Sequence, residues 1–106
     1  MVKKVVQGEI NVNLEHKKLS DISPLKNLTQ LKELILSYTQ VSDLTPLKNL
    51  AQLKELNISN TQVADLTPLK NLNQLAKLFL IKTKLTQGQV DDLQKALPNC
   101  DIRLIP

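Results

Sequence analysis

The sequence contains few aromatic residues and almost no cysteine. Of its 106 residues, Tyr38 and Phe79 are the two aromatic ones, and Cys100 is the single cysteine. One cysteine excludes an intramolecular disulfide and any zinc site built from paired cysteines. Because aromatic residues are so scarce, the core has to be built from Leu, Ile and Val, which suits thin repeated layers better than a globular centre.

Long apolar runs are also missing. No stretch approaches the roughly 20 apolar residues that a membrane span requires, and the opening MVKKVVQGEI lacks an apolar run of signal-peptide length. The net charge is +4, and Arg103 is the one arginine, so the mild excess of lysine mainly favours solubility. We therefore expect a cytoplasmic protein, while a domain cut from a longer exported protein would lack a signal in the same way.

Three nearly identical segments fill the middle of the chain. They begin at Ser23, Thr45 and Thr67 and read SPLKNLTQLKELIL, TPLKNLAQLKELNI and TPLKNLNQLAKLFL, so that the repeat is 22 residues long. A fixed period of this length is typical of solenoids, in which each repeat forms one coil. We expect a single domain over 1–106, with an N-terminal edge at 1–9, repeats at 10–85 and a C-terminal cap at 86–106.

Within each repeat, apolar residues first alternate and then recur at every third position. Leu34 and Leu36 are separated by one residue, and the same spacing recurs one repeat later, which indicates a β-strand. The threefold spacing that follows fits a short 3₁₀ or single-turn helix with an extended return better than an α-helix. The pattern predicts five short parallel strands, with the inward pairs Val12 and Leu14, Leu34 and Leu36, Leu56 and Ile58, Leu78 and Leu80, and Ile102 and Leu104.

The helical turn of each repeat has a marked start. Ser23, Thr45 and Thr67 are predicted N-cap residues, whose side-chain oxygens can accept from free backbone N–H groups, and the proline that follows each is predicted at the first helical position.

The two ends of the array differ from its middle. Thr86 and Gln89 have the spacing of a capping box and predict a helix that runs to about Leu97, with an inner face of Val90, Leu93 and Leu97. At the other end, Val2, Val5 and Val6 are too few for a capping helix, and we expect a strand or turn over the first coil. The N-terminal edge is therefore expected to be the less protected one.

The repeat is similar to a known one. LKELILSYTQVSDLTPLKNL resembles the 22-residue leucine-rich repeat of the internalin type, LxxLxLxxNxIxxIxxLxxL, and NCDIRLIP resembles the ends of other bacterial leucine-rich repeat proteins. The resemblance implies a right-handed α/β solenoid with a parallel sheet on its concave side, and protein binding through that side. One departure is systematic, because the asparagine ladder of the family is replaced by Thr39, Thr61 and Thr83, and by Lys17 in the first coil, and threonine offers fewer hydrogen bonds.

Residues between the inward pairs are expected to face the concave side. Phe79 and Ile81 are two large apolar groups on this otherwise polar face, with Ile35, Tyr38 and Ile105 as expected neighbours. Exposed apolar patches often mark contact sites, although scattered apolar surface residues are also normal. The predicted function is a non-enzymatic protein-interaction module, and the predicted contact residues are Ile35, Tyr38, Asn57, Phe79, Ile81 and Arg103.

Self-association is the alternative function. Five strands give a concave floor on the order of 300 Å², whereas a standard interface buries about 800 Å² per partner. Both sheet edges, 11–15 and 101–105, can expose unpaired backbone groups unless loops cover them. In this interpretation the terminal strand joins copies edge to edge, through Arg103 and Ile105, and the concave face is incidental.

Catalytic, metal and cofactor sites are not indicated. His16 belongs to the first coil and Cys100 to the last, roughly 15 to 20 Å apart at strand spacing, so they cannot form a dyad within one chain. Asp21, Asp43 and Asp65 form a repeated column, in which each carboxylate is expected to serve its own capping turn. Glu33 and Glu55 are adjacent carboxylates for which the sequence indicates neither an acid partner nor a pocket.

A nucleic-acid interface is the least favoured function. It would rest on the convex row of Lys26, Lys48 and Lys70, with Lys32 and Lys54 close by. The near absence of arginine and of stacking aromatic residues argues against it. Repetition alone also produces such a row, because any outward residue of the repeat is copied in every coil.

Overall fold

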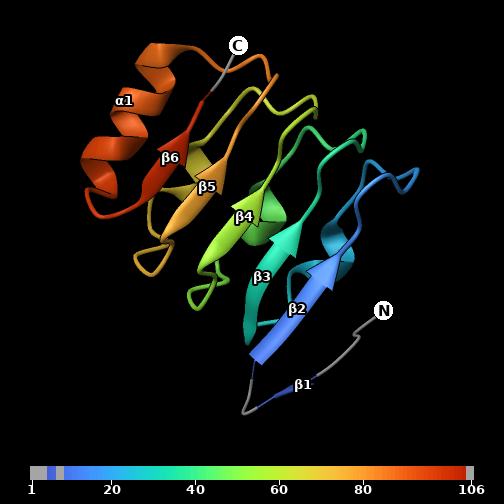
Figure 1. Cartoon of the computed structure of the whole chain (residues 1–106). Coiled ribbons are helices and arrows are strands. Elements are labelled where there is room, and N and C mark those ends of the chain that lie inside the picture. The colour runs from blue at the N-terminus through green and yellow to red at the C-terminus, as the bar shows by residue number, and fades with distance from the viewer. Residues whose placement is uncertain (1–4, 7–8, 105–106) are drawn as a thin grey trace.

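One sheet and one row of short turns form two sides of the molecule. The structure is a computed structural model that describes residues 5–6 and 9–104. Its sheet runs in chain order, and its strands are β1 (Val5–Val6), β2 (Glu9–Asn13), β3 (Leu31–Ile35), β4 (Glu55–Asn57), β5 (Lys77–Phe79) and β6 (Asp101–Arg103) (Figure 1). Strands β2 to β6 are parallel, as the repeat pattern predicts, and β1 is antiparallel to β2.

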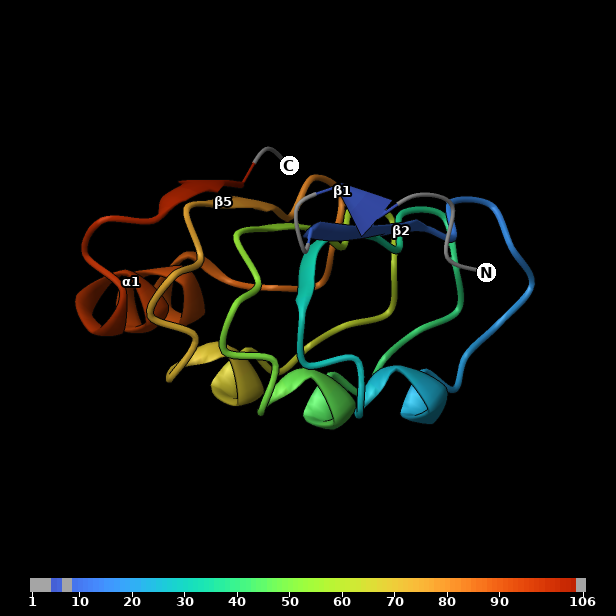
Figure 2. The ribbon, with the colours of Figure 1, turned by 90° about the horizontal axis from the view of Figure 1, so that it is seen from below.

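The opposite side of the solenoid consists of short helices. Three 3₁₀ helices, η1 (Ser23–Leu25), η2 (Thr45–Leu47) and η3 (Thr67–Leu69), lie in a row below the sheet, and α1 (Gln87–Ala96) follows at the C-terminal end of the row (Figure 2). This arrangement confirms the predicted α/β leucine-rich repeat solenoid. We call the outward surface of strands β2 to β6 the open face; it corresponds to the predicted concave side.

The 22-residue period determines the register of the sheet. Leu34 pairs with Leu56, and Ile35 pairs with Asn57, in the same way that each repeat aligns with the next. The hydrogen bonding continues beyond the strands, because the Leu36 amide donates to the Asn57 carbonyl at 2.8 Å and the Tyr38 amide donates to the Ser59 carbonyl at 3.1 Å. Equivalent residues of successive coils therefore lie side by side on the open face.

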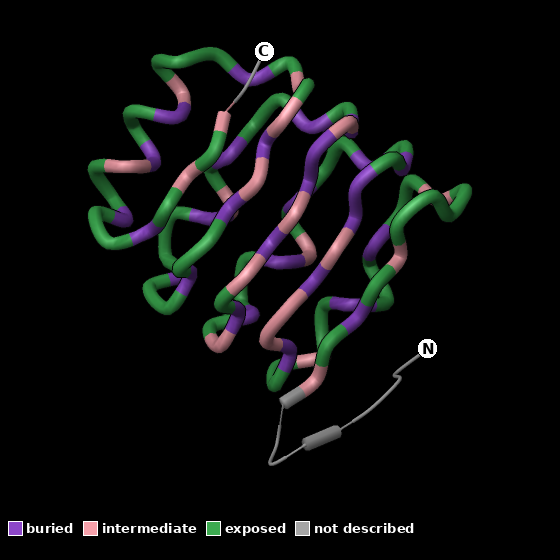
Figure 3. Tube along the Cα trace, viewed as in Figure 1, coloured by how far each residue is buried: buried purple, intermediate pink, exposed green. Residues whose placement is uncertain are grey.

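The core is a set of stacked leucine layers between the sheet and the turns. Leu56, Leu47 and Leu50 of the middle coils have no exposed surface. Buried and exposed residues alternate along each coil, as Figure 3 shows. In the first coil, Leu14 and Leu28 are only partly buried, because the described residues include no further coil that packs on them. Burial in this fold thus depends on having a neighbour on both sides.

The turns are capped differently from the prediction. The N-cap residues are Ile22, Leu44 and Leu66, so the serine or threonine is the first helical residue and proline the second, and none of the three caps has a side-chain hydrogen bond. The predicted Ser23, Thr45 and Thr67 caps are therefore wrong. Instead, the amide of each of these residues donates to the carboxylate two residues earlier, at 2.8 to 2.9 Å.

The physical reason for this difference lies in the aspartates. A carboxylate is a stronger acceptor than a hydroxyl, and aspartate readily bonds the backbone two residues ahead of it. The hydroxyl and the amide of residue 23, 45 or 67 hold the pKa of Asp21, Asp43 and Asp65 below the usual range. Each aspartate thus serves its own turn, as the sequence indicates.

Threonine replaces the asparagine ladder by bonding within its own coil. The hydroxyls of Thr39, Thr61 and Thr83 donate to the carbonyls three residues earlier, at 2.7, 2.6 and 3.0 Å. Thr39 and Thr61 are buried. Lys17, which takes this position in the first coil, is exposed, as expected for an edge residue.

The C-terminal cap follows the prediction closely. The Thr86 hydroxyl accepts from the Gln89 amide at 3.2 Å, and the Gln89 side chain accepts from the Thr86 amide at 2.9 Å, which completes the capping box. Val90, Leu93 and Leu97 are buried against the last coil. At the other end, Val5 and Val6 form the expected strand, which pairs with the edge of β2, whereas Val2 lies outside the described residues.

Candidate functional site

A register column crosses the middle of the open face. Ile35, Asn57, Phe79 and Arg103 are successive partners on strands β3 to β6. Four of the six predicted contact residues are therefore brought side by side. The first three are half-buried and Arg103 is exposed.

A shallow hollow of about 90 Å³ lies in this column. Its polar lining is Glu33, Glu55 and Asn57, and its apolar lining includes Ile35 and Phe79. Asn57 lies between Ile35 and Phe79 in the column, and its side chain is shorter than that of Phe79. The expectation that no pocket accompanies the two glutamates is therefore wrong. Ligand pockets usually exceed about 300 Å³, so this hollow fits one inserted side chain rather than a cofactor.

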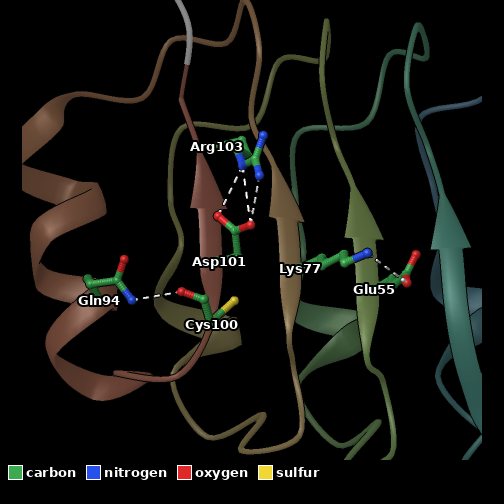
Figure 4. Close-up of polar contacts among 6 residues, drawn as sticks. All are labelled: Glu55, Lys77, Gln94, Cys100, Asp101 and Arg103. Atoms are coloured by element: carbon green, nitrogen blue, oxygen red, sulfur yellow. Dashed lines mark hydrogen bonds and ion pairs between the residues drawn. The ribbon is translucent and has the colours of Figure 1, made fainter.

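Ion pairs surround the hollow on its C-terminal side. The Lys77 ammonium lies 4.0 Å from a Glu55 carboxylate oxygen, and the Arg103 guanidinium donates to Asp101 at 3.0 Å (Figure 4). The hydrogen bond from Arg103 lowers the pKa of Asp101. Both ion pairs lie on exposed side chains, so a partner can compete for them with little loss of stability. Together they give the open face a polar border.

Tyr38 lies at the rim of the open face, away from the hollow. Its ring stacks on the His16 ring of the preceding coil, with 4.6 Å between ring centroids, and 50% of Tyr38 is exposed. Both residues have a left-handed backbone, with φ of 65° for His16 and 60° for Tyr38, as do Asn60 and Lys82 at the same position of later coils. The stacking of His16 on Tyr38 and the left-handed backbone of both residues were not predicted from the sequence.

The alternation along the strands also predicts that Ser37 and Ser59, two residues beyond Ile35 and Asn57, face the concave side. This prediction is wrong, because the two serines are only 2% and 6% exposed. The Ser59 hydroxyl accepts from the Ile81 amide of the next coil at 3.0 Å, and the Ser37 and Ser59 carbonyls accept amides of the preceding coil. These small residues therefore connect coils instead of contacting a partner. Ile81 is half-buried two residues beyond Phe79.

The predicted contact residues thus form two groups. Ile35, Asn57 and Phe79 line the hollow, while Tyr38 stacks on His16 at the rim and is not part of that lining. Arg103 extends the first group to the last strand. Ile105, the other residue predicted for self-association, lies outside the described residues.

Neither Cys100 nor the convex lysines line the hollow. Burial raises the pKa of the Cys100 thiol to about 11, so the thiol is neutral at physiological pH and unsuited to nucleophilic attack. Lys26, Lys48 and Lys70 are exposed directly after the 3₁₀ helices. The grooves beside Lys48 are also lined by Asp43 and Asp65, which weakens the attraction of these lysines for phosphate.

Residues 5–6 and 9–104 contain neither a cluster of metal ligands nor a membrane-spanning helix. No group of three or more His, Cys, Asp or Glu side chains among them could hold a metal ion. In the same part of the chain, no helix has the length and apolar character needed to cross a membrane.

The stacked coils, the parallel sheet and the repeated 3₁₀ turns define a leucine-rich repeat solenoid. Internalin C2 from Listeria monocytogenes has a similar structure, with a TM-score of 0.79 and 31% identity over 91% of this chain and 44% of that chain. Internalin F from the same species aligns with a TM-score of 0.73 and 34% identity over 84% of this chain and 28% of that one. The chain has a leucine-rich repeat fold of the internalin type.

A third solved structure supports the fold alone. A leucine-rich repeat protein from Leptospira interrogans aligns with a TM-score of 0.79 and 23% identity over 88% of this chain and 24% of that chain. This chain spans less than half the length of each of the three structures. No protein-family model and no curated protein sequence matches it.

Proposed function

We propose that the chain is a non-enzymatic protein-interaction module that binds a protein partner through its open face. The likeness to two internalins supports an interaction module in general. The main support for binding through the open face is the hollow that Ile35, Asn57 and Phe79 line. An apolar recess with a polar border is the arrangement in which an interface anchor residue is usually buried.

Binding begins with an apolar side chain of the partner that enters the hollow. Phe79 and Ile35 lose exposed apolar surface, while the glutamates at the hollow and the Arg103 guanidinium bond polar groups around it. The strands are held by hydrogen bonds between coils, so little conformational entropy is lost on binding. The hollow is small, and the Tyr38 rim therefore supplies additional contact area on the same side.

The test compares two variants with the same change in charge. Phe79→Asp adds one negative charge to the hollow, and Asn71→Asp adds one on the opposite side, in a groove between turns. Each immobilised variant captures proteins from an extract, and the bound proteins are compared by mass spectrometry. We expect a protein captured by the parent to be retained by Asn71→Asp and lost with Phe79→Asp, while circular dichroism confirms that both variants are folded.

Two results contradict the proposal. Capture of the same proteins by Phe79→Asp and by the parent would exclude the hollow as the binding site. Equal loss with Asn71→Asp would indicate that charge, and not the open face, determines capture.

Self-association through the terminal strand is the second candidate. Its supporting observation is that β6 is the last strand of the sheet and pairs on one side with β5. Arg103, however, donates to Asp101 within its own strand. An Ile105→Lys variant tests this candidate, because it would abolish a dimer formed through the terminal strand and leave partner capture unchanged.

A further inference from the structure

The two ends of the solenoid are closed to different extents. At the C-terminal end, Val90, Leu93 and Leu97 of the capping segment are buried, at 6%, 0% and 4% exposed. At the N-terminal end, the first coil has a hollow of about 350 Å³, and Leu14, Leu19 and Leu28 in its lining are only partly buried. The described part of the chain therefore has one sealed end and one apolar end.

The exposure of the first coil does not come from its own residue types. Leu14, Leu19 and Leu28 correspond to Leu36, Val41 and Leu50 one repeat later, and these three have no exposed surface. The same apolar positions are thus buried wherever another coil packs on them. Among the residues that the structure describes, no further coil packs on the first one.

Over residues 5–6 and 9–104, the edge of the sheet is only partly paired at the same end. In this part of the chain, β1 pairs with β2 at Glu9 and Ile10. Asn11, Val12 and Asn13 pair with β3, and among the described residues no strand pairs with them on the other side. Unpaired strand groups next to an apolar end favour docking of another β-containing surface.

We propose that the N-terminal end is an interface between two copies of this chain, related by a two-fold axis that stacks one first coil on the other. A contact between unlike ends is blocked, because α1 covers the C-terminal core. Only like ends can meet, and a two-fold contact of this kind closes at a dimer instead of growing into a filament.

The area of the end is sufficient for such a dimer. The molecule measures 36 × 29 × 20 Å, and the coils stack along its long dimension (Figure 2). The end therefore presents on the order of 600 Å² per copy, and two copies together reach the lower limit of about 1,200 Å² for standard interfaces.

The chemistry of the end has the usual arrangement of an interface. Leu14, Leu19 and Leu28 line its apolar hollow together with the exposed Asp21, and Lys17, which lies between Leu14 and Leu19 in the chain, is exposed. A two-fold axis brings both signs of charge from each copy to the same interface, so an overall charge of +4 does not prevent association.

Analytical ultracentrifugation of the full chain over a wide concentration series tests the proposal. We expect the mass to rise from 11.9 kDa to twice that value and no further. Leu19→Glu and Leu28→Glu bring a charge into the apolar centre and are expected to leave a monomer at every concentration. Ala96→Glu, at an exposed position of α1, makes a charged control at the sealed end and is expected to dimerise like the parent.

Hydrogen exchange provides a readout that does not depend on the variants folding. In the parent chain, the amides of residues 11–14 are expected to exchange more slowly as the concentration rises, while those of α1 do not change. A parent that is monomeric throughout overturns the proposal. A dimer that survives folded Leu19→Glu, or that Ile105→Lys abolishes, also overturns it, as does a mass that continues to grow beyond the dimer.

Discussion

The middle coils and the first coil have the same kind of apolar residues but differ in how much of them is buried. Leu56 in the middle has no exposed surface, whereas Leu19 in the first coil is partly exposed. The stability of a solenoid is approximately the sum of repeat terms and nearest-neighbour interfaces. A leucine in this protein therefore stabilises the fold more when its coil has a neighbouring coil on each side.

The largest expected loss of stability comes from a cavity in the middle of the stack. Leu56→Ala leaves a cavity with coils on both sides and is expected to lower the free energy of unfolding by about 3 to 4 kcal/mol. Leu19→Ala removes a side chain that is already partly in water and is expected to lower it by about 1 kcal/mol. Urea unfolding followed by circular dichroism measures both free energies. Equal losses would contradict the conclusion that a leucine packed between two coils stabilises the fold more than one in the first coil.

A smaller effect concerns the threonine ladder. Thr61→Val removes a buried hydroxyl that donates to the Ile58 carbonyl at 2.6 Å and leaves that carbonyl without its donor. We expect a loss of about 1 to 2 kcal/mol. Thr83→Val is expected to lose less, because Thr83 is partly exposed, its bond is 3.0 Å long, and water can replace it. The same urea measurement applies, and a larger loss for Thr83→Val would refute the argument.

Four residues at equivalent positions of successive coils have a left-handed backbone: His16, Tyr38, Asn60 and Lys82. Variants at these positions test stability and binding separately. Asn60 suits this conformation, whereas Tyr38 carries a strain of about 1 kcal/mol that its stack on His16 offsets by a similar amount. Tyr38→Asn is therefore expected to leave stability almost unchanged and to weaken partner capture. Asn60→Ala is expected to lose about 1 kcal/mol. Thermal melting of both variants, with the capture assay for Tyr38→Asn, checks these outcomes.

The smallest expected effect appears only in acid. Hydrogen bonds from residue 45 lower the pKa of Asp43 in the folded protein, and Asp21 and Asp65 behave alike. Their contribution is present above the unfolded pKa, about 4, and is lost as the pH falls through the lower folded value. Replacing all three with Asn is expected to make the stability of the fold decrease less as the pH falls. Melting temperatures measured between pH 6 and about 2 would show this difference.

A single substitution serves as the control for that experiment. Asp92→Asn, on the exposed side of α1, changes one carboxylate outside the turns. Its stability is expected to decrease in acid as steeply as that of the parent. If the triple variant loses stability in acid as steeply as this control, the aspartates do not cap the turns in the way their hydrogen bonds indicate.

Much of the fold could be predicted because the repeat itself determines which residues align. The 22-residue period is sufficient to pair Leu34 with Leu56, and the Thr86 and Gln89 spacing is sufficient for the capping box. Alternation also identifies the faces of each strand. These features depend on local spacing and apolar periodicity, which the sequence states directly.

The finer parts of the site could not be predicted in this way. The burial of Ser37 and Ser59 depends on how closely the next coil approaches, and the hollow depends on Asn57 having a shorter side chain than Phe79. The stack of His16 on Tyr38 requires a left-handed backbone, which a bulky aromatic residue such as Tyr38 seldom adopts. Side-chain depth and backbone conformation arise from the assembled stack rather than from one repeat.

The helix that seals the core comes after every repeat in the chain. During synthesis the ribosome therefore releases the coils first and their seal last. Until α1 emerges, the C-terminal end of the nascent stack is uncovered, and its leucine layers are available to chaperones and to other nascent chains. We expect productive folding of these coils to wait until α1 has left the ribosome, and fusions that delay α1 to aggregate more.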